Sequence, residues 1–241
     1  MSVASQTAAQ GPGLYATIYT PTFLSLVYDV IVLRFNLRYM WRCRTDTVLE
    51  PFFAENLSRH HLDIGVATGY FLDVSLSRPF RAQAKHSVTL VDLNPHPLNA
   101  ARARILSRAP NTTVETVVAD VTEPPPEMLR NSRFDSISMF NLFHCVPGRD
   151  KLRAFSLYKG LLAEGGTLTG CTVLGGSHAT NWLNYLYVKL YNHLGIFHNW
   201  DDRKEDFDRA LNENFEDVET TLVGMTLLFR ATKPRNPHSM V

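Results

Sequence analysis

The sequence predicts an α/β fold in which helices cover both faces of a single, doubly wound parallel sheet. Two observations predict this fold. From residue 61 onward, five short runs of strand-forming residues alternate with segments of helical pattern, which is the order that builds a parallel sheet. In addition, an aspartate lies near the end of each of the first three runs, at the edge of the sheet where such folds bind ligands. The 241 residues suffice for one domain of this kind.

The residues before the sheet are predicted to form a disordered start and a helical lid. Residues 1–13 are small and polar, so we expect them to be disordered. Residues 14–59 are expected to form the lid, because apolar side chains recur there at the three- and four-residue spacing of a helix. These side chains are Leu24, Val27, Tyr28, Ile31 and Phe35. Such a lid would cover a bound ligand and exclude water from it.

Residues 60–233 are predicted to form the ligand-binding core. Its five parallel strands are expected at residues 61–67, 87–94, 113–120, 134–144 and 166–174. Helices are expected at residues 70–77, 95–108 and 150–162. The prolines of the second helix lie in its first turn, where they are tolerated. The run Glu164, Gly165 and Gly166 is typical of the end of the third helix.

The last part of the core departs from the alternation of strands and helices. We expect a helical insertion at residues 177–200, with an apolar face formed by Leu183, Leu186, Tyr187, Leu190, Tyr191 and Leu194. A charged helix is expected at residues 201–211. An antiparallel hairpin at residues 214–233, with a tight turn at Gly224, is expected to complete the sheet. Residues 234–241 are expected to be a short tail.

Composition and charge exclude several classes of function. The formal net charge is +1. Proteins that bind nucleic acids usually have an excess of basic residues, so this charge does not indicate a nucleic-acid partner. The three cysteines contain no CxxC pair, which argues against a disulfide framework and a zinc site, and no other metal site is indicated. The longest apolar run, residues 23–33, is too short for a membrane span, which needs ~20 residues. We therefore expect a soluble, cytoplasmic protein.

A glycine turn after the first strand is the main candidate for a ligand site. Gly65 and Gly69 permit a tight turn and a close approach of the ligand to the backbone. The helix that follows directly has free amide groups facing this turn, which also contains Thr68. Asp63, just before the turn, would repel a pyrophosphate. It suits a cationic ligand that carries an ammonium and a sulfonium group.

Two further aspartates extend the candidate site across the neighbouring strands. Asp92, followed by Leu93, ends the second strand, where an acid accepts both ribose hydroxyls in nucleotide-binding sheets. Asp120 ends the third strand, where it can accept a hydrogen bond from an adenine amino group, and Val121 can cover one face of the ring. One such aspartate is more often a helix cap or turn residue. Three aspartates with a glycine turn indicate a nucleoside site.

The run LDIGVATG, followed by LVDLN, VVAD and FDSISMFNLFH, resembles the signature of class I S-adenosylmethionine-dependent methyltransferases. The resemblance covers about residues 60–175. It implies a Rossmann-like sheet that binds S-adenosylmethionine and releases S-adenosylhomocysteine. The residues named above would bind this cofactor, together with Phe140 and Asn141 of the run FDSISMFNLFH. Ala67 stands where many members have a second glycine, and we expect little effect because alanine is small.

The segment YTPTFLSLVYDVIVLRFNLRYMWRC, joined to a short core, resembles small fungal enzymes found with polyketide synthases. This resemblance implies O-methylation of an enolic or phenolic hydroxyl of a polyketide, such as the 4-hydroxyl of an α-pyrone. The acceptor is then a small molecule, and aromatic side chains of the lid and insertion would contact it. These are Tyr15, Tyr28, Tyr39, Trp41, Trp182 and Tyr185. Alternatively they pack against the sheet, which is the usual role of aromatic stripes on helices.

Methyl transfer from a sulfonium mainly requires that the methyl group and the acceptor oxygen be close and aligned. A base helps only when the acceptor is weakly acidic. The candidate bases are His144, which follows the fourth strand, and His178, which follows the fifth. His193 and His198 could reach the site from the insertion. The alternative for His144 is a histidine packed under the loop and bonded to the backbone.

Three other functions stay open at this point. A methyltransferase-like enzyme can use the sulfonium charge for a cyclisation or rearrangement without methyl transfer. Tyr185 and Lys189 form a Tyr-x-x-x-Lys pair like that of short-chain dehydrogenases, but Asp63 before the glycine turn argues against a dinucleotide. The third function is a cofactor-binding subunit without activity, which the intact glycine and acid set argues against. The oligomeric state is not predicted.

Overall fold

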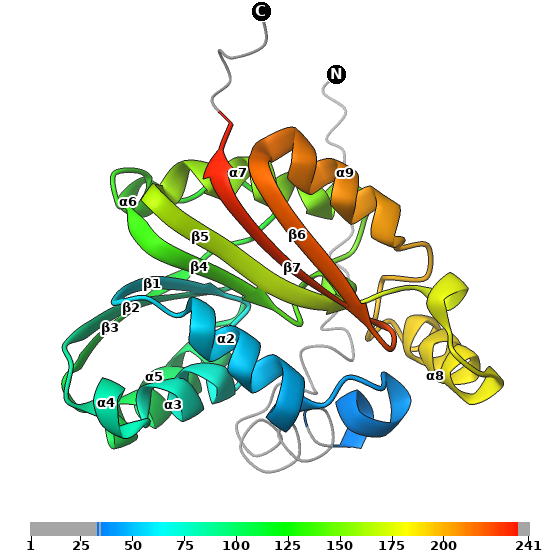
Figure 1. Cartoon of the computed structure of the whole chain (residues 1–241), viewed down its shortest axis with the longest axis horizontal. Coiled ribbons are helices and arrows are strands. Elements are labelled where there is room, and N and C mark those ends of the chain that lie inside the picture. The colour runs from blue at the N-terminus through cyan, green and yellow to red at the C-terminus, as the bar shows by residue number, and fades with distance from the viewer. Residues whose placement is uncertain (1–32, 34, 236–241) are drawn as a thin grey trace, which may run out of the picture.

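The computed structural model describes residue 33 and residues 35–235. In this part of the chain, seven strands form one sheet in the order β3-β2-β1-β4-β5-β7-β6 (Figure 1). The strands are β1 (His60–Ile64), β2 (His86–Asp92), β3 (Thr112–Val118), β4 (Phe134–Phe140), β5 (Leu162–Val173), β6 (Phe215–Val223) and β7 (Thr226–Pro234). β1 to β5 are parallel, and β7 lies antiparallel between β5 and β6. The predicted doubly wound sheet with a terminal antiparallel hairpin is confirmed.

Helices cover both faces of this sheet (Figure 1). One face carries α2 (Glu50–Asn56), α3 (Tyr70–Leu76), α4 (Pro79–Ala82) and α5 (Pro95–Arg108). The other face carries α6 (Glu127–Arg130), α7 (Arg153–Tyr158) and α9 (Lys204–Asn214). Helix α8 (Trp182–His193) stands apart at the side of the molecule where the β6–β7 hairpin turns (Figure 1). Short 3-10 turns occupy Phe143–Cys145, Asp150–Leu152, Lys159–Leu161 and Gly176–His178, and one wide helical turn, Thr45–Leu49, leads into α2.

Strand periodicity separates the interior into two apolar clusters, one on each face. Successive side chains of a strand point to opposite faces. Leu62 and Ile64 of β1 therefore enter the cluster that contains Phe155 of α7. Val88 and Leu90 of β2 enter the cluster that contains Leu98 of α5. In β1 the residues that alternate with the two apolar ones are His61 and Asp63, and both are buried.

The predicted end of the third helix is wrong. The helical stretch expected at residues 150–162 covers residues 150–161, as α7 with a 3-10 turn at each end. Glu164, Gly165 and Gly166 do not end a helix but belong to β5, which begins at Leu162. The pairing of β4 with β5 shifts register between Phe134 and Ser136, and Gly165 takes a φ of 72° in this stretch. The glycine accommodates a bulge, which is a common use of glycine in strands.

The apolar face predicted for the insertion is divided, since Tyr187 and Tyr191 pack against the core whereas its leucines are on the exposed face of α8. Its leucines are 42–50% exposed; they are Leu183, Leu186, Leu190 and Leu194. The buried side of α8 contains Asn184 and Val188 instead. It faces residues 36–41, because Asn184 donates to Met40 O at 2.6 Å and the Tyr187 hydroxyl donates to Asn36 Oδ1 at 3.0 Å. Hydrogen bonds from polar side chains therefore decide which face of α8 is buried.

Candidate active site

The glycine turn between β1 and α3 has three residues in the left-handed region. Gly65, Ala67 and Gly69 have φ values of 77°, 46° and 68°. A Cβ atom at Gly65 would lie 2.7 Å from Leu142 Cδ1, and one at Gly69 would lie 2.8 Å from Ala101 Cβ. Both glycines are therefore required for conformation and for space. Ala67 adopts the same backbone region at a cost of about 1 kcal/mol.

Helix α5 holds this turn from the far side. Arg104 Nε donates to the buried Asp73 Oδ2 at 2.8 Å, and Arg104 also donates to Thr68 O at 3.4 Å. The Arg104 guanidinium lies 5.3 Å from the centre of the Tyr70 ring. The Tyr70 hydroxyl in turn donates to Glu50 Oε1 at 2.6 Å. These contacts join α2, α3 and α5 around Thr68 and fix the backbone of the turn.

Two cavities lie at the carboxyl ends of β1 to β4. The larger cavity has a volume of about 340 Å³, and the predicted residues Asp92, Leu93, Asp120 and Val121 line it. The smaller cavity, of about 20 Å³, is lined by the predicted residues Asp63, Thr68, Gly69 and Phe140 and by Leu33 from the N-terminal part. Three predicted residues line both cavities, namely Gly65, Ala67 and Asn141. The structure thus brings all the predicted cofactor-binding residues together.

The aspartates around these cavities differ in environment. Burial raises the pKa of Asp63 to about 7, an effect that the Ser138 hydroxyl opposes and Asp92 reinforces. Burial raises the pKa of Asp92 to about 6, although the backbone N–H of Asn94 donates to Asp92 Oδ1 at 2.9 Å. Asp120 Oδ1 accepts from both the backbone and the hydroxyl of Thr122, at 2.8 and 2.7 Å. Asp120 therefore also has the turn-forming role that aspartate often has.

Asn141 is the residue directly after the end of β4. It has a φ of 55°, and its backbone N–H donates to Cys171 O at 2.8 Å. The Cys171 thiol lies 3.5 Å from Asn141 Oδ1 and donates to it. Asparagine is one of the residues that tolerate the left-handed region. This conformation places Asn141 at the boundary between the two cavities.

The structure places the predicted base His144 away from the two cavities. The ring is buried, lies 4.4 Å from the Phe197 ring and lines neither cavity. The backbone N–H of Val173 donates to His144 Nδ1 at 3.4 Å, and Thr172 Oγ1 lies 3.3 Å from the same nitrogen. Burial, with a smaller effect from Lys151, lowers the pKa of His144 to about 3. Because Nδ1 accepts from the backbone, the proton of the neutral ring is on Nε2.

His178 is also placed away from the two cavities. It lies in the 3-10 turn Gly176–His178, and its Nε2 accepts from the backbone N–H of Lys204 at 3.5 Å. The histidine that does line the larger cavity is His198. Sequence reasoning placed it in the insertion but could not show that it reaches the site.

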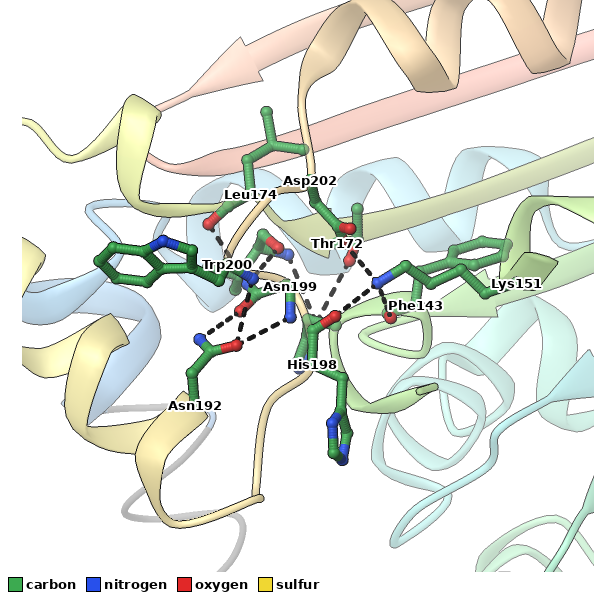
Figure 2. Close-up of polar contacts among 11 residues, drawn as sticks. Phe143, Lys151, Thr172, Leu174, Asn192, His198, Asn199, Trp200 and Asp202 are labelled. Carbon is green, nitrogen blue, oxygen red and sulfur yellow. Dashed lines mark hydrogen bonds and ion pairs between the residues drawn. The ribbon is translucent and has the colours of Figure 1, made fainter. Parts of the chain in front are cut away.

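A buried polar cluster fixes the segment that carries His198 (Figure 2). Lys151 Nζ donates to His198 O at 2.9 Å, to Phe143 O at 3.2 Å and to Asp202 Oδ2 at 2.7 Å. Asn199 Nδ2 donates to Val173 O at 2.8 Å, and the His198 backbone N–H donates to His144 O at 2.7 Å. The His198 ring points away from this cluster in Figure 2. It also borders a polar groove of about 780 Å³ that Asp202 and Arg209 help to form.

Of the aromatic residues predicted to contact the acceptor, the four that the structure describes do not form a common wall. Trp41 is in the core, 5.5 Å from the Tyr187 ring and 5.7 Å from the Phe197 ring. Tyr39 and Trp182 are exposed, and neither lines the cavities. Tyr185 packs 5.4 Å from Trp200 on the outer side of α8. Tyr15 and Tyr28 lie outside the described residues, as do the predicted disordered start and residues 14–32 and 34 of the predicted lid.

Sequence reasoning missed several residues at the site. Leu142, Cys145, Val146 and Pro147 complete the wall of the larger cavity. Their position directly after the fourth strand, beside the predicted Asn141, is the feature of the sequence that could have indicated them.

The described residues contain no group of three side chains that could hold a metal ion. Within the same part of the chain, none of the helices has the length and apolarity that crossing a bilayer requires.

Comparison with known proteins gives the family. A family model described as a methyltransferase domain matches residues 62–168. The chain is 50% identical to the O-methyltransferase NEC2 of Pyricularia oryzae, over 93% of this chain and 94% of that protein. It is 38% identical to the physcion biosynthesis cluster O-methyltransferase of Aspergillus chevalieri, over 90% of this chain and 94% of the relative.

A solved structure shares the fold. An O-methyltransferase family protein from Burkholderia thailandensis matches with a TM-score of 0.57 and 16% identity, covering 77% of this chain and 55% of that one. At this level of identity the likeness concerns the arrangement of the sheet and its helices. It agrees with the strand order described above.

Proposed function

The chain belongs to the S-adenosylmethionine-dependent methyltransferases, and we propose that it methylates an enolic or phenolic hydroxyl of a polyketide, such as a 4-hydroxy-α-pyrone. Two relatives support an oxygen acceptor, because both are named as O-methyltransferases and one is named for a biosynthesis cluster. The observation that carries the proposal is the placing of Asp63, Asp92 and Asp120 around two adjoining cavities.

The side chains that line these cavities suit S-adenosylmethionine in charge. Gly65 and Gly69 hold the turn in this conformation, since Cβ atoms there would collide with Leu142 and Ala101. We assign to the adenosine part the side of the larger cavity that Asp92 and Asp120 line, with Asp92 at the ribose and Asp120 at the adenine amino group. The methionine part would extend along the glycine turn toward the smaller cavity, where Asp63 would bind its ammonium group. Carboxylates at these positions disfavour a ligand with phosphates.

The remaining predicted residues complete this arrangement. Leu93 and Val121 would contact the faces of the adenine ring, and the backbone of Ala67 and Thr68 would follow the cofactor through the turn. Asn141 lines both cavities and Phe140 lines the smaller one, and we assign the sulfonium to the place beside them. When bound, the cofactor supplies a methyl group on a cationic sulfur. The protein has to align an acceptor oxygen with that group and keep water away.

The acidity of the acceptor decides how much base catalysis is needed. An enolic hydroxyl of a pyrone ionises readily, so alignment suffices. For a weaker acid, we assign the proton-accepting role to His198, which lines the larger cavity. Burial and the charge of Lys151 lower the pKa of His198. The ring is therefore neutral near pH 7 and able to accept a proton.

The test is a methylation assay with defined acceptors. The full chain is incubated with S-adenosylmethionine and 4-hydroxy-α-pyrones or phenols, and the products are identified by mass spectrometry and NMR. We expect one added methyl group on oxygen. O-acetylated pyrones serve as a control and should give no product. A cyclised product of unchanged composition would contradict methyl transfer, and methylation on carbon or nitrogen would contradict the assignment to oxygen.

A further inference from the structure

A chain of buried side chains leads from the cofactor-facing Asp63 into the sheet. The Ser138 hydroxyl makes a short hydrogen bond to Asp63 Oδ1. Ser138 Oγ lies 2.9 Å from His61 Nε2, and His61 Nδ1 lies 2.7 Å from Ser136 Oγ. The backbone N–H of Ser58 donates to Ser136 Oγ at 2.9 Å. All four side chains are buried.

The register of two parallel strands creates this chain. His61 pairs with Ser136 and Asp63 pairs with Ser138, in β1 and β4 respectively. Residues two apart in a strand point to the same face. The two serines therefore lie beside the histidine and the aspartate on one face of the sheet. The intervening Leu62 and Ile137 point to the other face and enter its apolar cluster.

The direction of each hydrogen bond follows from the donor at the carboxylate. Ser138 donates its only hydroxyl proton to Asp63, so Ser138 Oγ accepts from His61 Nε2–H. The neutral ring then accepts at Nδ1 from Ser136. Ser136 Oγ in turn accepts from the backbone N–H of Ser58. Every donor points toward the carboxylate, and each hydroxyl both accepts and donates one hydrogen bond, which strengthens its neighbours in the chain.

The groups around these hydrogen-bonded side chains keep His61 neutral. Burial lowers the pKa of His61 to about 3, and the charges of Arg81 and His86 act in the same direction. The Phe53 ring of α2 packs 5.7 Å from the imidazole. At the other end, burial raises the pKa of Asp63, the Ser138 hydroxyl lowers it, and the neighbouring Asp92 of β2 raises it. The Ser138 hydrogen bond therefore opposes both burial and Asp92.

We propose that His61 and Ser138 are positioning residues that hold Asp63 in its ionised form for the cofactor's ammonium group. The proposal rests on the assignment of Asp63 to that group. His61 does not touch either cavity and acts through Ser138. Without these hydrogen-bonded side chains, the Asp63 carboxylate would be desolvated by burial and would receive no compensating hydrogen bond from β4.

The test measures the affinity for S-adenosylhomocysteine by isothermal titration calorimetry from about pH 5.5 to about pH 8.5. In the wild type, we expect affinity to rise with pH as Asp63 ionises. Ser138→Ala should weaken binding near neutral pH about tenfold and move the rise to higher pH. His61→Phe should act in the same direction but less. His61→Gln, whose amide can donate to Ser138, should restore most of the affinity.

The matched control is His60→Phe. His60 is the neighbour in the same strand, and its ring packs 4.8 Å from Phe134, so affinity and its pH dependence should stay as in the wild type. Asp63→Asn tests the assignment on which the proposal rests, and unchanged binding would overturn that assignment. If Asp63→Asn weakens binding while Ser138→Ala leaves the pH dependence unchanged, the assignment stands and the positioning role is wrong. Ser138→Ala removes one oxygen, so it tests the proposal even where His61→Phe does not fold.

Discussion

Lys151 and Asp202 form a buried ion pair, in which Nζ lies 2.7 Å from Oδ2 and the side chains are 4% and 12% exposed. The pair joins the 3-10 turn before α7 to the segment after α8. That segment also contains Asn199, whose side chain donates to Val173 O and Leu174 O at 2.8 and 3.3 Å. His198 is thereby held between the ends of β4 and β5, although it lies in a connection outside the regular elements.

Lys151→Met should therefore destabilise the protein strongly. The substitution leaves the Asp202 carboxylate buried without its cation, which costs about 3 kcal/mol in the free energy of unfolding. The control is Lys204→Met, since the Lys204–Asp208 pair is also short, at 2.5 Å, but about a third exposed. Its loss should cost about 0.5 kcal/mol. Urea unfolding measures both values, and equal losses would contradict the role given to burial.

Ala67→Gly should stabilise the chain slightly. Ala67 has a φ of 46°, so glycine relieves strain of about 1 kcal/mol in the folded state, while it adds up to about 1 kcal/mol of backbone entropy to the unfolded state. The net change in stability should thus be small and positive, and the affinity for S-adenosylhomocysteine should stay the same. Ala54→Gly, in the middle of α2, is the control and should destabilise by about 1 kcal/mol. A loss at Ala67 as large as that at Ala54 would show that the alanine methyl is needed.

Asp63→Asn should make the ligand-free protein more stable at neutral pH while it weakens cofactor binding. Burial raises the pKa of Asp63 from 3.8 to about 7, so the folded chain binds more protons than the unfolded chain between these values. Stability should then fall as pH rises through this window. Asparagine removes the ionisation, and the gain near neutral pH should be on the order of 2 kcal/mol.

Thermal unfolding at several pH values checks this prediction. The wild type should lose stability between about pH 4 and about pH 7, and Asp63→Asn should lose less. Asp92 contributes to the remaining slope, because burial raises its pKa to about 6. Saturating S-adenosylhomocysteine should stabilise the wild type far more than the variant. An identical pH profile for the two proteins would contradict the ionisation assigned to Asp63.

The order of strands and helices could be predicted from the sequence because it depends on local pattern. Helix α5 has the predicted bounds, Pro95–Arg108, and the hairpin turns at Gly224, where φ is 60°. The cofactor residues could be predicted for a similar reason, since the carboxyl ends of neighbouring parallel strands meet at one edge of the sheet.

The other residues of the site depend on contacts between segments that are distant in the sequence. His144 follows the fourth strand as predicted, but its ring turns toward Thr172 and Phe197. The leucine face of α8 is exposed because Asn36 and Met40 pair with its polar face. The role of His61 depends on the register between β1 and β4. No local pattern contains this information.

Substitution of His198 distinguishes two ways in which the protein could promote methyl transfer, namely alignment of the acceptor alone and alignment with base catalysis. If His198 accepts the proton of weakly acidic acceptors, His198→Ala should lower kcat for a phenol about 100-fold and leave the affinity for S-adenosylhomocysteine nearly unchanged. For an acidic 4-hydroxy-α-pyrone, which ionises without help, kcat should change little. His178→Ala is the control, since His178 lines neither cavity. Equal losses for both acceptors would indicate that His198 acts in binding or alignment, and no loss for either would exclude it from the reaction.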